Sequence, residues 1–192
     1  MQKFLIIGLG NIGAEYAHTR HNIGFDVADV LVRKHSSSWR LDRLAEVSEI
    51  KIKGRTLVVI KPTTYMNLSG RALRYWMDKE KVPVEHTLTL VDDLAISLDK
   101  IRLRPSGSHA GHNGLKDIEA TLGNNLYPRL RFGIGNDFPK GRQIDFVLAP
   151  WVAKEKPVVD QKVNASVELI EDFALMGLDF AMNKYNKLIF TV

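Results

Sequence analysis

The chain contains no cysteine, and this absence excludes several kinds of chemistry. Without thiols there can be no disulfide framework, no cysteine nucleophile and no thiolate-bound metal. The His-Glu-x-x-His spacing of zinc-dependent hydrolases is missing too. We therefore expect a cytoplasmic protein that uses neither a metal ion nor an organic cofactor.

Long hydrophobic runs are also missing. No apolar stretch approaches the roughly 18 residues needed to cross a bilayer, and residues 1–7 are too short for the apolar region of a signal peptide. No internal repeat, low-complexity tract or linker divides the 192 residues. Because this length is typical of one domain, we expect a single domain over residues 1–192, a monomer, and no membrane association.

Negative charge is in the minority, since 27 Lys and Arg face 22 Asp and Glu for a net charge of +5. This balance suits a polyanionic partner such as nucleic acid, or simply a basic surface. Arginine alternates with apolar residues in the segments IRLR and RLRF, which contain Arg102, Arg104, Arg129 and Arg131. If these segments are strands, the apolar residues face the core, so we expect every one of these arginines to face solvent or a ligand.

The stretch from Gly8 to Phe25, GLGNIGAEYAHTRHNIGF, carries the densest chemistry. It follows a short apolar run at residues 4–7 that predicts a buried strand, and its first three glycines match the G-x-G-x-x-G dinucleotide fingerprint. That fingerprint needs a helix to begin at the third glycine. The first apolar stripe with helical spacing begins only at Ile23, so the pattern argues against a nicotinamide cofactor.

Strand-like and helical patterns alternate along the chain, which predicts an α/β fold. Strands are expected at residues 4–7, 45–53, 56–61, 87–91, 101–104 and 129–135. Helices are expected at about residues 22–35, 69–81 and 114–122, Ser69 being the N-cap of the second, and two more follow residue 155. The loop at 105–113 should be mobile, and residues 146–151 should form an apolar flap. We predict a twisted mixed sheet with helices on both faces and a site at the strands' C-terminal ends.

Polar side chains follow the ends of these predicted strands. His21 is a candidate general base, and either Asp92 or Asp93 could fix its tautomer by accepting a hydrogen bond. Three amides lie in loops next to strands or helices: Asn11, Asn67 and Asn113. Each offers a donor and an acceptor without charge, although each is also a common turn residue. No serine stands as an obvious nucleophile, which favours direct attack by water.

The stretch GLGNIGAEYAHTRHNIGF resembles the N-terminal signature of the bacterial-type peptidyl-tRNA hydrolases. Four further blocks follow in the order and spacing of that family: KPTTYMNLSG at 61–70, the pair Asp92-Asp93, GHNGLKDI at 111–118 and RLRFGIG at 129–135. The resemblance spans residues 4 to about 148. It implies hydrolysis of the ester between a peptide's C-terminus and the terminal ribose of tRNA, which releases free peptide and tRNA during translation.

The resemblance also implies roles for individual residues. The catalytic residues would be His21 as the base, Asp92 and Asn11. Substrate-binding positions would be Tyr16, Met66, Asn67, His112 and Asn113. Contacts to tRNA phosphates would come from Arg102, Arg104 and Arg131, and no metal ligand is implied.

The chain departs from the family pattern at Ile12, Val91, Ala95, Ser106 and Ser108. The change at residue 12 leaves a turn less rigid, and the others alter the rim of the crevice without touching His21 or Asp92. An alternative function is non-catalytic RNA binding, because some plant organelle proteins similar to these hydrolases serve intron splicing. The full set of site residues favours the enzyme.

Overall fold

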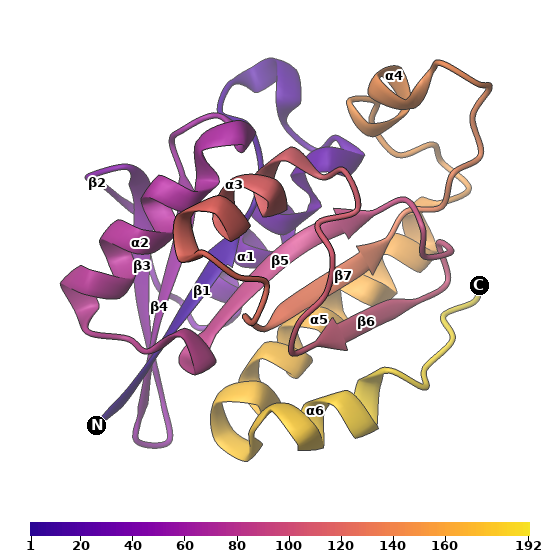
Figure 1. Ribbon diagram of the computed structural model, residues 1–192. Helices are drawn as coiled ribbons and strands as arrows, with labels where there is room; N and C mark the ends of the chain where they lie inside the picture. Colours follow the sequence, from indigo (N-terminus) through magenta and orange to yellow (C-terminus); the bar gives the residue numbers. More distant parts are fainter.

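A seven-stranded mixed β-sheet with helices on both faces forms the protein, and the computed structural model describes all residues from 1 to 192 (Figure 1). The strands are β1 (Gln2–Gly8), β2 (Arg40–Asp42), β3 (Ala45–Ile52), β4 (Arg55–Pro62), β5 (Thr87–Asp93), β6 (Ile101–Arg104) and β7 (Arg129–Gly133). They lie in the order β2-β3-β4-β1-β5-β7-β6. The predicted α/β architecture with a mixed sheet is confirmed.

Six α-helices and four short 3-10 helices connect and cover these strands. The α-helices are α1 (Ile23–Lys34), α2 (Ser69–Glu80), α3 (Asn113–Leu122), α4 (Gln143–Val147), α5 (Lys156–Met176) and α6 (Leu178–Tyr185). The 3-10 helices are η1 (Ala14–Tyr16), η2 (Arg20–Asn22), η3 (Met66–Leu68) and η4 (Val84–His86). None of these helices has the length and apolar character required to span a membrane.

The central strand β1 is buried on both faces, which explains its uninterrupted apolar sequence. Leu5 and Ile7 pack into a core that also contains Trp76 of α2. Phe4 and Ile6 point to the opposite face, where the core contains Phe173 of α5. Because successive side chains of a strand alternate between faces, one apolar run supplies both cores. In Figure 1, α2 and α3 accordingly lie in front of the sheet, and α1 and α5 lie behind it.

Four adjacent strands, β4, β1, β5 and β7, form a parallel core and bring their C-terminal ends to the same edge of the sheet. β1 pairs in parallel with β4 and with β5, and β5 pairs in parallel with β7. The flanking strands β3 and β6 run antiparallel to this core, and β2 pairs antiparallel with β3, so that it has the same direction as the core strands. The loops that follow the parallel strands therefore meet above the ends of β1 and β5, where open α/β sheets bind ligands.

Packing rather than phosphate binding accounts for the first glycine of the G-x-G-x-x-G pattern. A Cβ atom on Gly8 would collide with the backbone carbonyl group of Gly24 in α1, where the end of β1 and the helix approach closely. The helix begins at Ile23, well after Gly13. Gly8 therefore serves the contact between β1 and α1, and the geometry differs from that of a dinucleotide fold.

The expectation that all four arginines of β6 and β7 avoid the core is wrong for Arg129, which is fully buried. Its guanidinium carbon lies 3.6 Å from the centroid of the Tyr127 ring. The group donates hydrogen bonds to the backbone oxygens of Gly107 at 2.9 Å and Asn125 at 2.6 Å. The segments that contain Gly107 and Asn125 cover this face of β7, and their carbonyl groups satisfy the buried cation.

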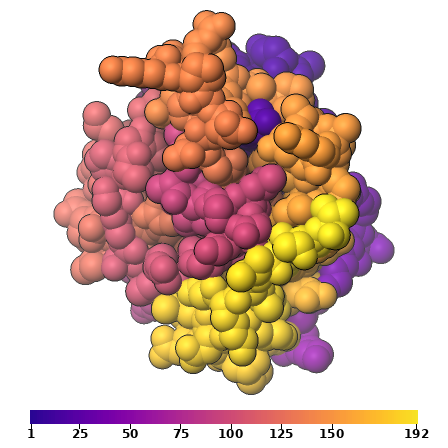
Figure 2. All heavy atoms as spheres, turned by 90° about the vertical axis from the view of Figure 1, so that its right-hand side faces the viewer, coloured from indigo at the N-terminus to yellow at the C-terminus, as the bar shows by residue number.

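Smaller differences concern the ends of elements. Ser69 is the first residue of α2 and not its N-cap, and its hydroxyl donates to the carbonyl oxygen of Met66 at 2.7 Å. The short edge strand β2 was not expected from its three residues. The C-terminal segment, yellow in Figure 2, lies against the segment around β6, where the N–H of Phe190 donates to the carbonyl oxygen of Asp99 at 2.9 Å.

Candidate active site

A cleft of about 660 Å³ opens at the C-terminal ends of the parallel strands. Its lining includes most of the site residues expected from the sequence: Asn11, His21, Met66, Asn67, Asp92, His112, Asn113 and Arg131. They come from β5, from β7 and from the loops and helices that follow the parallel strands, so the sheet edge brings together residues far apart in the chain. Tyr16, Arg102 and Arg104 lie outside this lining.

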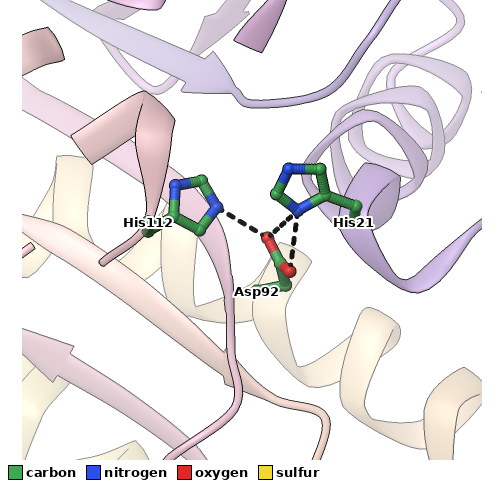
Figure 3. Close-up of side chains that lie close together, drawn as sticks. All are labelled: His21, Asp92 and His112. Atoms are coloured by element: carbon green, nitrogen blue, oxygen red, sulfur yellow. Dashed lines mark hydrogen bonds and ion pairs between the residues drawn. The ribbon is translucent and has the colours of Figure 1, made fainter. Parts of the chain in front are cut away.

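His21 and Asp92 form a hydrogen-bonded pair within the cleft (Figure 3). The Nδ1 atom of His21 lies 2.9 Å from Oδ2 and 3.1 Å from Oδ1 of Asp92. An ionised carboxylate can only accept, so Nδ1 carries the proton and Nε2 has the free lone pair. The ring is thus held in the tautomer that a general base requires.

The pKa of Asp92 is lowered and the pKa of His21 is raised, and in both residues burial opposes the shift. Burial favours the protonated form of Asp92, but its contacts with His112 and His21 outweigh burial and hold the pKa of the carboxyl well below its ordinary range. For His21, burial disfavours the charged form, yet the charge and hydrogen bond of Asp92 prevail and raise the imidazole pKa. An ionised Asp92 therefore makes His21 a stronger base.

His112 holds the other side of the same carboxylate. Its Nε2 atom lies 2.8 Å from Oδ1 of Asp92, and its Nδ1 atom accepts the backbone N–H groups of Gly114 at 3.1 Å and Leu115 at 3.4 Å. His112 is thus the N-cap of α3. Because Nδ1 must accept, the ring proton resides on Nε2 and is donated to Asp92.

Asn11 is oriented by one backbone N–H group and by the side chain of Asn22, a residue not expected in the site. Its side-chain oxygen accepts the N–H of Met66 at 2.8 Å. The side-chain amide of buried Asn22 accepts from the N–H of Asn11 and donates to its carbonyl oxygen, both at 2.9 Å. The side-chain N–H₂ group of Asn11 is left without a protein acceptor. In the sequence, only its position directly after His21 could have indicated that Asn22 belongs to the site.

The chain matches the family model of peptidyl-tRNA hydrolase over residues 5–191. It belongs to the peptidyl-tRNA hydrolase family. The peptidyl-tRNA hydrolase of Phocaeicola vulgatus is 52% identical over 185 residues, which cover 96% of this chain and 99% of that protein. The peptidyl-tRNA hydrolase of Cytophaga hutchinsonii is 50% identical over 184 residues, covering 96% and 98%.

Solved structures of peptidyl-tRNA hydrolases have the same fold as this family member. The crystal structure of peptidyl-tRNA hydrolase from Acinetobacter baumannii superposes with a TM-score of 0.91 at 32% identity, and the match covers 97% of this chain and 95% of that one. An Arg119Gln mutant of the same enzyme superposes with a TM-score of 0.92 at 33% identity, covering 98% and 96%.

Asn67 and Asn113 present free amides to the cleft of this peptidyl-tRNA hydrolase family member. Both are exposed, and neither side chain makes a hydrogen bond within the protein. Asn67 lies in η3 and Asn113 is the first residue of α3. Rigid elements therefore support two unpaired amides next to the His21–Asp92 pair. Tyr16, by contrast, is half-buried in η1, away from this lining.

The second carboxylate, Asp93, has different partners from Asp92. Its Oδ1 atom accepts the N–H of Ala95 at 2.8 Å, and its Oδ2 atom lies 3.2 Å from Nη1 of Arg131. Arg131 also donates through Nη2 to the carbonyl oxygen of Ser108 at 2.6 Å. Asp92 is therefore the residue that faces the histidine, and Asp93 anchors the cleft-lining arginine.

The other two candidate phosphate ligands differ in how free they are. Arg102 donates through Nη1 to the carbonyl oxygens of Asn186 at 2.7 Å and Ile101 at 2.9 Å. Arg104 is exposed at the end of the edge strand β6, and its side chain makes no hydrogen bond within the protein. Arg104 is therefore the cation of this pair that a ligand could engage without breaking an existing contact.

A metal ion could in principle be surrounded by His21, Asp92 and His112, because their potential ligand atoms lie within 4.8 Å of one another. A metal would have to replace the proton on Nε2 of His112. That ring already uses Nδ1 to accept two backbone N–H groups, so a neutral metal-bound ring would lose its contacts with α3. The hydrogen bonding favours protons at these positions over a metal ion.

One side of the cleft is apolar. Ile144 and Val147 of α4, together with Phe138 and Leu148, contribute to its lining. The flap expected at residues 146–151 thus begins earlier in the chain. Trp151 does not line the cleft and is buried beside Phe132.

Proposed function

We propose that this chain hydrolyses the ester bond between the C-terminal carboxyl group of a peptide and the terminal ribose of tRNA. The observation that carries the proposal is the His21–Asp92 pair, in which the free Nε2 atom is turned away from the carboxylate in an open cleft (Figure 3). Membership of the peptidyl-tRNA hydrolase family supports this substrate.

In this mechanism, Nε2 of His21 removes a proton from water as the water oxygen attacks the ester carbonyl carbon. The ionised carboxylate of Asp92 stabilises the imidazolium that forms. The imidazolium then gives its proton to the departing ribose oxygen, so water has supplied a hydroxyl group to the peptide and a proton to the tRNA. No covalent enzyme intermediate is required.

The asparagines fit the remaining tasks. Negative charge develops on the ester carbonyl oxygen in the transition state, and donors fixed in advance stabilise it. We assign this role to the side-chain N–H₂ of Asn11, because its oxygen is already held by Met66. Asn67 and Asn113, whose amides are free, would bind the peptide backbone and the ribose. Met66 and His112 also line the cleft, whereas the geometry does not support Tyr16 as a direct ligand.

For the tRNA body, we propose phosphate contacts from Arg104 and from Arg131 at the rim of the cleft. Arg104 has the stronger case because it is exposed and unpaired, whereas Arg102 is engaged by Asn186. We further propose that the protein acts as a monomer in the cytoplasm and without a metal ion.

The decisive experiment compares His21→Ala with the wild-type protein on a peptidyl-tRNA. We expect turnover to fall by about 10² to 10⁴-fold, the usual contribution of a general base. His35→Ala is the matched control, because His35 pairs with Glu171 outside the cleft. Near wild-type turnover in His21→Ala would exclude this residue as the base. A wild-type protein that binds tRNA without releasing peptide would instead favour the non-catalytic RNA-binding alternative.

A further inference from the structure

Arg20 precedes the proposed base in η2 but does not line the cleft, and its side chain is only 6% exposed. Its guanidinium group contacts a distant segment of the chain. Nη1 donates to the carbonyl oxygen of Phe146 at 3.1 Å, and Nη2 donates to the carboxylate of Glu155 at 2.8 Å. The guanidinium carbon lies 4.2 Å from the centroid of the Phe146 ring and 5.3 Å from that of Trp151. One side chain thereby holds both ends of residues 146–155.

Backbone contacts reinforce this connection. The N–H of Arg20 donates to the carbonyl oxygen of Ala149 at 3.1 Å, and Thr19 forms an isolated antiparallel bridge with Pro150. Glu155 lies directly before the long helix α5, which is packed on the sheet. The segment after α4 is therefore fixed between η2 and the start of α5.

The helix α4 has few other supports. In Figure 1 it stands apart from the sheet, and in Figure 2 the orange segment that contains it projects from the top of the molecule. Among the helices and strands, η2 is its principal packing partner. Since Ile144 and Val147 of α4 line the same cleft as His21, the contacts of Arg20 fix the apolar lining relative to the base.

We propose that Arg20 is a positioning residue that places the apolar lining from α4 around the substrate. This inference rests on the proposed function and names the substrate group concerned, an apolar side chain of the peptide beside the ester. Ile144, Val147 and Phe138 can bury the aliphatic or aromatic surface of a peptide side chain. The ribose and the phosphates of tRNA require polar and basic residues instead. Arg20 acts through α4 and touches no reacting atom.

The test measures Arg20→Gln on one tRNA that carries either N-acetyl-leucine or N-acetylglycine. We expect the KM for the leucine substrate to rise by about tenfold, because the lining is no longer fixed, and kcat to stay within about threefold. The KM for the glycine substrate should change much less. The acidic limb of the pH profile should not move, because the bonds between His21 and Asp92 remain. Hydrogen exchange should accelerate at the amides of residues 143–149 and stay unchanged in β5.

Two further variants keep the test decisive if Arg20→Gln does not fold. Phe146→Leu removes the ring on which the guanidinium packs, and Arg20→Lys keeps the charge beside Glu155 but loses the planar fork. Both should raise the KM for the leucine substrate in the same direction. Arg74→Gln in α2 is the control, since it loses a cation and a bond to the carbonyl oxygen of Thr121 in α3. It should leave both KM values unchanged.

The outcomes separate this inference from the proposed function. A fall in kcat with unchanged KM would overturn the inference and place the effect on His21. An equal rise of KM for both substrates would overturn the assignment of the peptide side chain and point to the tRNA end. If the wild-type protein hydrolyses neither substrate, the proposed function fails. Unchanged exchange at residues 143–149 would separately refute the link between Arg20 and α4.

Discussion

Replacement of Asp92 by Asn should inactivate the protein by moving a proton on His21. Asp92 accepts from Nε2 of His112 through Oδ1 and from Nδ1 of His21 through both oxygens. An asparagine has one acceptor oxygen and one N–H₂ donor in place of these two oxygens. Its N–H₂ group must therefore face one of the two rings.

The contacts of His112 decide which ring this is. His112 cannot exchange its tautomer without losing the bonds from the N–H groups of Gly114 and Leu115. The amide oxygen of residue 92 should thus turn to His112, and its N–H₂ group should face Nδ1 of His21. His21 would then accept through Nδ1 and carry its proton on Nε2, where it cannot act as a base. The equivalent tautomer error in serine protease triads lowers kcat by about 10⁴-fold, and we expect a loss of that order here.

Steady-state kinetics on a peptidyl-tRNA measure this effect, and KM should change little because Asp92 is buried and its carboxylate is already engaged by His21 and His112. A second substitution tests the reasoning. His112→Leu removes the competing donor, so the amide oxygen of Asp92→Asn can turn back to His21. The double variant should recover about tenfold in kcat over Asp92→Asn alone, roughly the value of one hydrogen bond in a buried site. No recovery in a folded double variant would refute the tautomer argument.

Three further predictions follow from the same geometry. His21 must be neutral to act, and its pKa is raised. As the pH is lowered, kcat/KM should therefore begin to fall at a pH above the ordinary imidazole pKa of about 6.5, which a pH profile of kcat/KM measures. Arg104→Ala should weaken tRNA binding and reduce the slope of log affinity against log salt by about one unit, with little effect on a peptide ester of adenosine. Treatment with EDTA should leave turnover unchanged, and a loss restored by Zn²⁺ would contradict the proton assignment at His112.

The sequence was sufficient for the sheet and for most of the cleft, because both depend on local patterns. The apolar run at residues 4–7 predicted the buried β1, and the polar groups that follow strand ends predicted where side chains would meet. The resemblance implied Asp92, but the residue pattern alone did not distinguish Asp92 from Asp93. Adjacent residues of a strand face opposite ways, and their partners, His21 and Arg131, come from other elements.

What could not be predicted depends on contacts between distant residues. Arg129 has the same alternation as its neighbours, yet the loops that bury it come from residues 107 and 125, whose approach no local pattern specifies. Arg20 likewise appeared as a cation beside His21, although its partners are Phe146 and Glu155. Periodicity identifies the face of an element, but the partner on that face is fixed by tertiary packing.

The spacing between His21 and Asp92 depends in turn on Gly24, which supports a last prediction. A Cβ atom there would lie 2.5 Å from the backbone nitrogen of Leu9 and 2.6 Å from the carbonyl oxygen of Leu90. Both neighbours are backbone atoms of the sheet edge, so α1 would have to move away from β5. His21 precedes this helix directly and Asp92 lies in β5, so the same movement would lengthen their hydrogen bond.

Gly24→Ala should therefore destabilise the fold by about 1–3 kcal/mol, as expected for overpacking, and also lower kcat. Thermal unfolding and peptidyl-tRNA kinetics on the same sample measure the two effects. Gly54→Asn is the control, because a Cβ there meets open space and Asn tolerates the φ of +81° at that turn. It should alter neither quantity appreciably. If Gly24→Ala lowers the melting temperature yet keeps wild-type kcat, the close approach of α1 to the sheet serves stability alone and does not set the distance between base and carboxylate.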